Sequence, residues 1–139
     1  MYREQLHMLG LGLEDRMASK VGLLSGGQRQ ALTLLMAAMR TPKLLLLDEH
    51  TAALDPKTAA KVLELSDKII HEQKLTALMI THNMQDAIDL GNRLIMMHEG
   101  RIVVDVAGEE KKKLTRADLM GLFEKAAGQQ LSSDRLLLS

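Results

Sequence analysis

Four consecutive residues, Ser25-Gly26-Gly27-Gln28, combine two features that suit the binding of an anion. Ser25 and Gln28 have the spacing of a capping box, in which a hydroxyl and an amide side chain close the first turn of a helix. The two glycines have no Cβ, so they would leave backbone N–H groups bare at the positive end of the helix dipole. The turn therefore predicts a phosphate-binding helix start, and its simpler interpretation is an ordinary capped helix.

Two carboxylates, Asp48 and Glu49, directly follow the apolar run 44–47. The run is short and follows Pro42, which favours a strand that is buried on both faces of a parallel sheet. Ligands of open α/β folds bind at the carboxyl ends of such strands. We therefore expect the carboxylates at a ligand-binding edge, with an acidic turn after a buried strand as the simpler alternative.

Two further residues stand at the ends of expected elements. Asp55 precedes Pro56, and this pair predicts an N-cap followed by a proline in the first helical position. His82 ends the next expected strand, 76–81, within the string Ile-Thr-His-Asn. A lone histidine is usually structural, so its role depends on the motifs around it.

Taken together, the segments 24–28, 44–49, 52–55 and 80–83 resemble the C-terminal portion of an ABC transporter ATP-binding protein, an ABC-type ATPase of the P-loop NTPase superfamily. They correspond to its signature turn, Walker B strand, D-loop and switch histidine. Residues 29–32, Arg-Gln-Ala-Leu, also match the usual continuation of the signature. The resemblance covers essentially the whole chain and implies ATP and Mg²⁺ as cofactors.

The resemblance also implies a role for each residue. The signature turn and Asp55 would act at the interface with a second subunit, where the turn meets the γ-phosphate of ATP held by that subunit. Asp48 would hold Mg²⁺, Glu49 would orient or deprotonate the attacking water, and His82 would bond the γ-phosphate. The cofactor-binding residues implied are Ser25, Gly26, Gly27, Gln28 and Asp55; the catalytic ones are Glu49 and His82.

Two features depart from the family pattern. No Gly-x-x-x-x-Gly-Lys-Ser/Thr loop occurs, since Gly22 and Gly27 have the right spacing but Gln28-Arg29 follows them. We therefore expect a partial subunit that is inactive alone. His50 occupies a position where proline is more usual, and we interpret it as a tolerated substitution without a catalytic role.

Composition narrows the partners. The chain has 139 residues, 18 Lys plus Arg and 18 Asp plus Glu, so no strong field would attract nucleic acid. It has no cysteine and no apolar run near the ~18 residues that span a bilayer. The resemblance implies two partners: a second ATP-binding subunit in a head-to-tail dimer, and transmembrane permease subunits. It places the chain in the cytoplasm, peripheral on the inner face of the membrane.

The intact subunit would energise solute transport, and the strings around Asp48 and His98 resemble ATPases of bacterial importers for amino-acid-like solutes. Two alternatives belong to other classes. One is a non-catalytic interaction module that docks onto a complete ATPase. The other is the C-terminal lobe of a chromosome-maintenance or DNA-repair ATPase, which should carry heptads and basic surface that this sequence lacks.

The elements that must position these residues follow from periodicity and punctuation. Alternating strands and helices predict an α/β fold with parallel strands flanked by helices and an edge hairpin. We divide it into residues 1–40, the end of the helical subdomain, and residues 41–139, the C-terminal part of the ATPase core. Expected helices lie at 2–9, from 25 to about 40, from 55, at 84–90 and from 115 to Gly128; expected strands lie at 44–47, 76–81, 93–97 and 101–106.

The apolar spacing also predicts which helix faces are buried. Expected core positions are Leu32, Leu35, Met36 and Met39; Ala59, Val62, Leu63, Ser66, Ile69 and Ile70; and Leu119, Leu122, Phe123 and Ala126. Lys111 to Lys113, next to two glutamates, are expected to form a solvated surface patch.

Overall fold

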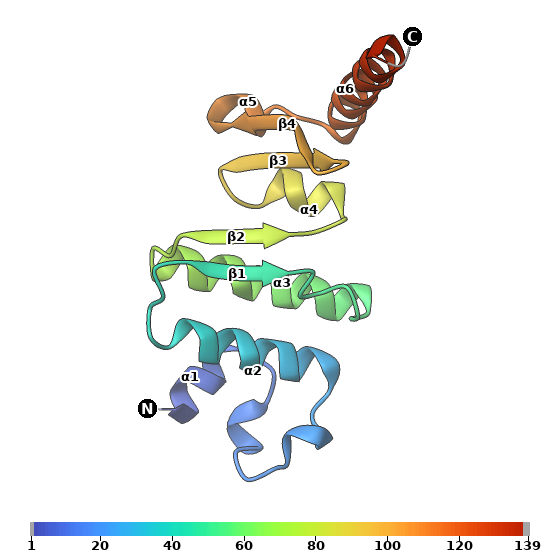
Figure 1. Cartoon of the computed structure of the whole chain (residues 1–139). Helices are drawn as coiled ribbons and strands as arrows, with labels where there is room; N and C mark the ends of the chain where they lie inside the picture. The colour runs from blue at the N-terminus through green and yellow to red at the C-terminus, as the bar shows by residue number, and fades with distance from the viewer. Residues whose placement is uncertain (1, 138–139) are drawn as a thin grey trace. The chain divides into compact units, whose positions relative to one another are not determined.

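The computed structural model describes residues 2–137. They form two compact units, one ending at Ile80 and one beginning at Thr81, which we call the N-terminal and C-terminal units. This boundary differs from the predicted division between residues 40 and 41, which concerned subdomains of a larger fold and stays a prediction. The elements are α1 Tyr2–Met8, η1 Leu13–Asp15, η2 Val21–Leu23, α2 Gly26–Ala38, β1 Leu45–Asp48, α3 Pro56–Glu72, β2 Ala77–Ile80, α4 Met84–Asp89, β3 Arg93–His98, β4 Arg101–Ala107, α5 Gly108–Lys112 and α6 Arg116–Leu137 (Figure 1).

The parallel strands predicted from the sequence are present in the N-terminal unit. β1 and β2 run parallel (Figure 1). Leu46 lies opposite Leu78, and Asp48 lies opposite Ile80. Burial of β1 alternates, because Leu45 and Leu47 point into the core while Leu46 is 65% exposed. The expectation that this strand is buried on both faces is therefore wrong for the described chain. An all-leucine run gives no sign of which face is covered.

Helix α2 begins where the sequence predicted, but a different face of it is buried. Its core residues are Gly27, Ala31, Leu34, Leu35 and Ala38. Met36 is 63% exposed and Met39 is also exposed, which corrects the predicted stripe. Positions 31, 34, 35 and 38 have the same helical spacing as positions 32, 35, 36 and 39. Since nearly every residue here is apolar, packing decided the face.

Helix α3 follows its predicted cap and packs against α2. Its buried residues are Val62, Leu65, Ser66 and Ile69, so three of the six predicted positions are confirmed and Leu65 was missed. Ala59, Leu63 and Ile70 are only partly buried. The core of this unit consists of leucine, alanine and one isoleucine from four elements and the loops between them. Its buried members are Leu9, Leu13, Leu24, Ala31, Leu34, Leu35, Ala38, Leu45, Leu47, Leu65, Ile69 and Leu75.

The C-terminal unit contains the predicted hairpin. β3 and β4 are antiparallel, and His98 pairs with Arg101 across a two-residue turn. Both turn residues have positive φ, 47° at Glu99 and 75° at Gly100, as tight hairpin turns that follow the strand twist require. The hairpin forms a sheet of its own, separate from the β1–β2 pair.

The last two helices bring two corrections. Lys111 lies in α5 and is only 3% exposed, so it does not belong to a solvated lysine patch. α6 begins, as predicted, near residue 115, where Thr115 and Asp118 exchange backbone-to-side-chain bonds, but it continues past the predicted end at Gly128. One glycine costs a helix only about 1 kcal/mol, which does not stop it. Leu119 is fully buried as predicted, whereas Leu122 is exposed.

Candidate functional site

The start of α2 has the predicted local geometry. Ser25 Oγ accepts a bond from the amide of Gln28 at 3.2 Å, and Gln28 Oε1 accepts one from the amide of Ser25 at 3.0 Å. The capping box is thus complete. It uses neither the amide of Gly26 nor that of Gly27, which are the groups expected to face an anion.

The two glycines also have a packing role that the sequence did not reveal. A Cβ at Gly27 would lie 2.1 Å from Thr58 Cγ2, and one at Gly26 would lie 3.2 Å from Leu54 Cδ2. Glycine at position 27 is therefore required by the close approach of α2 to α3. This contact places the signature turn beside the start of α3, where Asp55 is the N-cap.

Asp55 is held by its own helix. Its carboxylate accepts a bond from the amide of Thr58 at 3.1 Å. Hydrogen bonds from the Thr58 side chain and amide lower the pKa of Asp55, so the exposed carboxylate stays ionised. The structure thus brings together two of the predicted site segments, the turn at 25–28 and Asp55.

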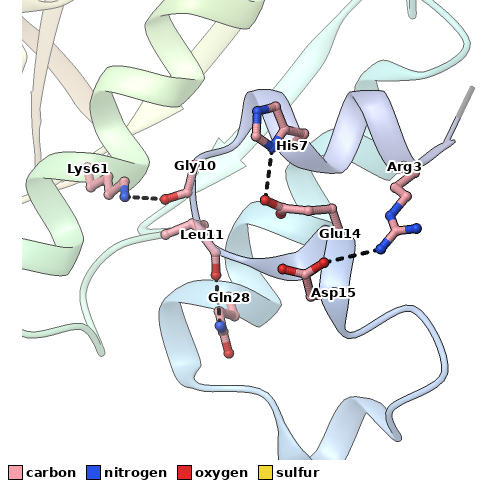
Figure 2. A network of polar contacts seen from close by, with 8 residues as sticks. All are labelled: Arg3, His7, Gly10, Leu11, Glu14, Asp15, Gln28 and Lys61. Carbon is pink, nitrogen blue, oxygen red and sulfur yellow. Dashed lines mark hydrogen bonds and ion pairs between the residues drawn. The ribbon is translucent and has the colours of Figure 1, made fainter.

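Gln28 has a second bond that was not predicted. Its Nε2 donates to the carbonyl of Leu11 at 3.0 Å, and Lys61 Nζ of α3 donates to the carbonyl of Gly10 at 2.5 Å (Figure 2). Both polar atoms of the Gln28 side chain are engaged within this chain. Gln28 therefore supports the turn, while the amides of the two glycines provide its ligand-binding potential.

A polar network fixes the segment that these bonds hold. His7 Nδ1 contacts Glu14 Oε1 at 2.9 Å, and Arg3 contacts Asp15 at 3.2 Å (Figure 2). The pKa of Glu14 is lowered most by a backbone hydrogen bond and next by the hydrogen bond with His7. These contacts connect α1 to η1, so the chain before the signature turn has a defined conformation.

Asp48 and Glu49 lie at the carboxyl end of β1, as predicted, and both are exposed. Glu49 has φ +44°, a left-handed value that costs a residue other than glycine about 1–3 kcal/mol. Two backbone bonds hold it there: its amide donates to Ile80 at 3.0 Å, and its carbonyl accepts from Ala52 at 3.0 Å. Strain of this kind is typical of functional turns.

The carboxylates suit a magnesium ion that retains most of its waters. Within residues 2–137, no three His, Asp or Glu side chains are grouped closely enough to hold a metal by themselves. Mg²⁺ commonly binds through one or two carboxylates together with water and substrate phosphates. An exposed Asp48 fits that mode of binding.

His50 is the residue of this turn that sequence reasoning undervalued. Its Nε2 lies 2.9 Å from Ser66 Oγ in the middle of α3, and burial lowers the pKa of the imidazole. The signal available in the sequence was a serine on the buried stripe of a helix, which needs a polar partner.

His82 belongs to the C-terminal unit and follows β2 by two residues. It is exposed and precedes Asn83, which caps α4 by accepting from the amides of Gln85 and Asp86. Burial raises the pKa of Asp86, Asp89 raises it further, and the charge of His82 opposes them. The catalytic, nucleotide-binding and metal-binding roles of all these residues stay predictions.

The sequence matches a family model described as ABC transporter over residues 2–52. It is 51% identical over 121 residues to a tyrosine transport ATP-binding protein of Clostridioides difficile, a match that covers 87% of this chain and 48% of that protein. It is 34% identical to a methionine import ATP-binding protein of Oenococcus oeni, covering 91% of this chain and 36% of the other. The chain thus spans about half the length, or less, of these relatives.

Solved structures are similar as well. A dimeric ATP-binding cassette in a post-hydrolysis state, bound to ADP and Pi, matches with a TM-score of 0.59 and 34% identity over 75% of this chain and 44% of that chain. An inward-facing metal-chelate type ABC transporter matches with a TM-score of 0.65 and 30% identity over 87% of this chain and 47% of that one. The α/β fold expected from the sequence agrees with both. None of the helices described within residues 2–137 has the length and apolarity needed to cross a bilayer.

Proposed function

Because this chain belongs to the ABC-type ATPases, we propose that it is part of an ATP-binding and ATP-hydrolysing subunit that energises solute transport through a membrane permease. The observation that carries the proposal is the capped start of α2, where two glycines lie directly beside the start of α3. Bare amides and the helix dipole at this point favour a phosphate. Members of this family generally bind and hydrolyse ATP.

In this proposal the site residues form two groups that contact two different nucleotides. Ser25, Gly26 and Gly27 face the γ-phosphate of ATP held by a second ATP-binding subunit in a head-to-tail dimer, with Gln28 bracing the turn. Asp55, next to this turn, links the two subunits. The dimeric cassette among the similar structures supports this arrangement.

The residues at the strand ends act on the chain's own nucleotide. Mg²⁺, when bound, would neutralise phosphate charge, and Asp48 would hold it through water. Glu49 accepts the proton of the attacking water from a fixed backbone position. His82 donates a hydrogen bond to the γ-phosphate and helps to orient the same water.

The partners and location follow from this role. Permease subunits are the membrane partners, no nucleic acid is expected, and the subunit lies in the cytoplasm on the inner face of the membrane. The solute would be amino-acid-like, a choice supported by relatives whose names specify tyrosine transport and methionine import. The 139-residue chain alone is expected to have negligible ATPase activity, since it lacks the Gly-Lys-Ser/Thr phosphate loop.

A chimera tests the proposal. The chain is joined to the part of the Clostridioides difficile relative that it does not match, and ATP binding and hydrolysis are measured. We expect MgATP hydrolysis by the chimera, and a loss of about 10²–10⁴-fold in kcat with retained ATP binding for Glu49→Gln, because the amide keeps the shape and loses the basicity.

Glu64→Gln is the matched control, because Glu64 is an exposed glutamate on α3 to which no catalytic role is assigned. It should leave kcat unchanged. Hydrolysis at the original rate by the Glu49→Gln chimera would show that Glu49 is not the base.

A further inference from the structure

The carboxyl end of β1 is attached to α3 by a side-chain bond whose direction can be deduced. Ser66 Oγ lies 2.7 Å from the carbonyl of Val62 and 2.9 Å from His50 Nε2. A carbonyl can only accept, so the single hydroxyl proton of Ser66 goes to Val62. Ser66 Oγ must therefore accept from His50, and Nε2 is the ring nitrogen that carries the proton.

Both partners of this bond are restrained. Ser66 is 2% exposed and lies between the buried residues Val62 and Ile69 of α3. His50 is half-buried and immediately follows Glu49. Because the hydroxyl is fixed by the helix backbone, its acceptor lone pair offers His50 one defined position.

The turn needs such an attachment because Glu49 has a left-handed backbone, with φ +44°. Its amide bonds Ile80 of β2, and its carbonyl accepts from Ala52 within the turn. These backbone bonds tie the turn to the strand and to itself. His50 adds a connection to α3. The turn that carries Glu49 is therefore held by β2 through the backbone and by α3 through a side chain.

We propose that His50 is a positioning residue that, through its bond to Ser66, fixes the backbone of the turn that presents Glu49. The inference rests on the proposed function for the catalytic value of that position, but the bond itself can be tested without nucleotide. It also revises the interpretation of His50 as a merely tolerated substitution. His50 restrains the turn through its side chain.

The first test uses the 139-residue chain and nuclear magnetic resonance. The ¹⁵N shifts of the His50 ring should show a protonated Nε2 at neutral pH. Amide exchange of Ala52 should become about two- to tenfold faster in Ser66→Ala and in His50→Phe, the range expected for one lost hydrogen bond. The double variant should be no faster than the faster single one, because both remove the same bond.

Two controls separate positioning from general destabilisation. His50→Gln retains an N–H donor near the position of Nε2, so exchange at Ala52 should return to within about twofold of the original rate. The amide of Leu75, which bonds Ile70 near the other end of α3, should be unaffected in every variant. A ring protonated on Nδ1 but not on Nε2, or unchanged Ala52 exchange in both Ser66→Ala and His50→Phe, would overturn the proposal.

The second test uses the chimera described above. His50→Phe should lower kcat about two- to tenfold with the KM for ATP unchanged, and His50→Gln should restore it. If the exchange results are as expected but the chimera hydrolyses no ATP, the proposed function fails and the bond stands. If the chimera hydrolyses ATP and Glu49→Gln has no effect, only the role of Glu49 as the base fails. If Glu49→Gln abolishes turnover while His50→Phe changes neither exchange nor kcat, the positioning role fails alone.

Discussion

The two units of this chain are stabilised in different ways. The N-terminal unit buries an extended core of leucine and alanine, and its helices approach so closely that Gly27 must lack a side chain. The C-terminal unit has a small core at Leu94, Val104, Val106 and Leu119. Polar contacts of α5 and of the hairpin supplement it. Most of the candidate site is in the unit with the larger core, which suits residues that must be held in fixed positions.

The polar contacts of the C-terminal unit are specific. Lys111 Nζ donates to the carbonyls of Ile88 and Leu90 at the end of α4, so a buried ammonium closes that helix. Arg93 donates two bonds to Asp105 across the hairpin, at 2.8 and 2.6 Å. Because its core is small, we expect a single substitution to reduce the stability of the C-terminal unit as a whole more than a comparable substitution reduces that of the N-terminal unit.

The largest expected effect is that of Leu119→Ala. Removing a fully buried leucine from the small core should cost about 2–5 kcal/mol. Hydrogen exchange across β3 and β4 should then become rapid. Leu34→Ala, in the larger core, should leave protection against exchange detectable in β1 and β2. Leu122→Ala, at an exposed position of α6, the helix that carries Leu119, should have a small effect. Equal loss of protection in both units would contradict the comparison.

Gly27→Ala should destabilise the N-terminal unit by about 1–3 kcal/mol, because the new methyl group overlaps Thr58 Cγ2. Denaturant unfolding would measure it. Thr58→Ala removes the overlapping group, so the double variant should recover most of the loss. Gly22→Ala, with open space around the position, is the control. A substitution at position 27 therefore changes the packing of α2 against α3, whatever its effect on phosphate binding.

Lys111→Met should lower the stability of the C-terminal unit by about 1–3 kcal/mol, because it leaves two helix-end carbonyls without their donor. Methionine is chosen because it keeps much of the apolar stem of lysine. Thermal unfolding of Lys112→Met provides a matched comparison, since Lys112 is exposed and its Nζ bonds Glu109 at 2.6 Å. That change should stay within about 0.5 kcal/mol. Equal effects of the two substitutions would show that the buried lysine contributes little.

The smallest expected difference between the two units is in how their stability changes as the pH falls. The lowered pKa of Asp55 gives the N-terminal unit stability that is present above the unfolded pKa of about 3.9 and is lost as the pH falls through the folded pKa. Asp86 has the opposite sign, because burial raises its pKa and protonation in the folded state relieves that cost as the pH falls. Urea unfolding between pH 7 and 3 should show a shallower acid loss for Asp55→Asn and a steeper one for Asp86→Asn. Identical profiles for the two variants would refute this assignment.

Local chemistry was predictable from the sequence. Ser25 with Gln28, Asp55 with Thr58, and Thr115 with Asp118 bond across three residues, so their geometry depends only on adjacent chain. The same holds for the hairpin turn at Glu99-Gly100. The carboxylates at the end of β1 were also placed correctly, because an apolar run followed by acidic residues marks a strand end.

Other features were decided by contacts between distant residues. The buried face of α2, the burial of Lys111, the close approach of Gly27 to Thr58 and the bond from His50 to Ser66 each join positions that sequence spacing does not relate. In a helix of mostly apolar residues, two faces satisfy the same periodicity, and the partner surface selects one of them. The sequence by itself determined the caps, the turns and the family to which the chain belongs. Only the tertiary structure decided which side chains support the site, because that support comes from residues brought together by folding.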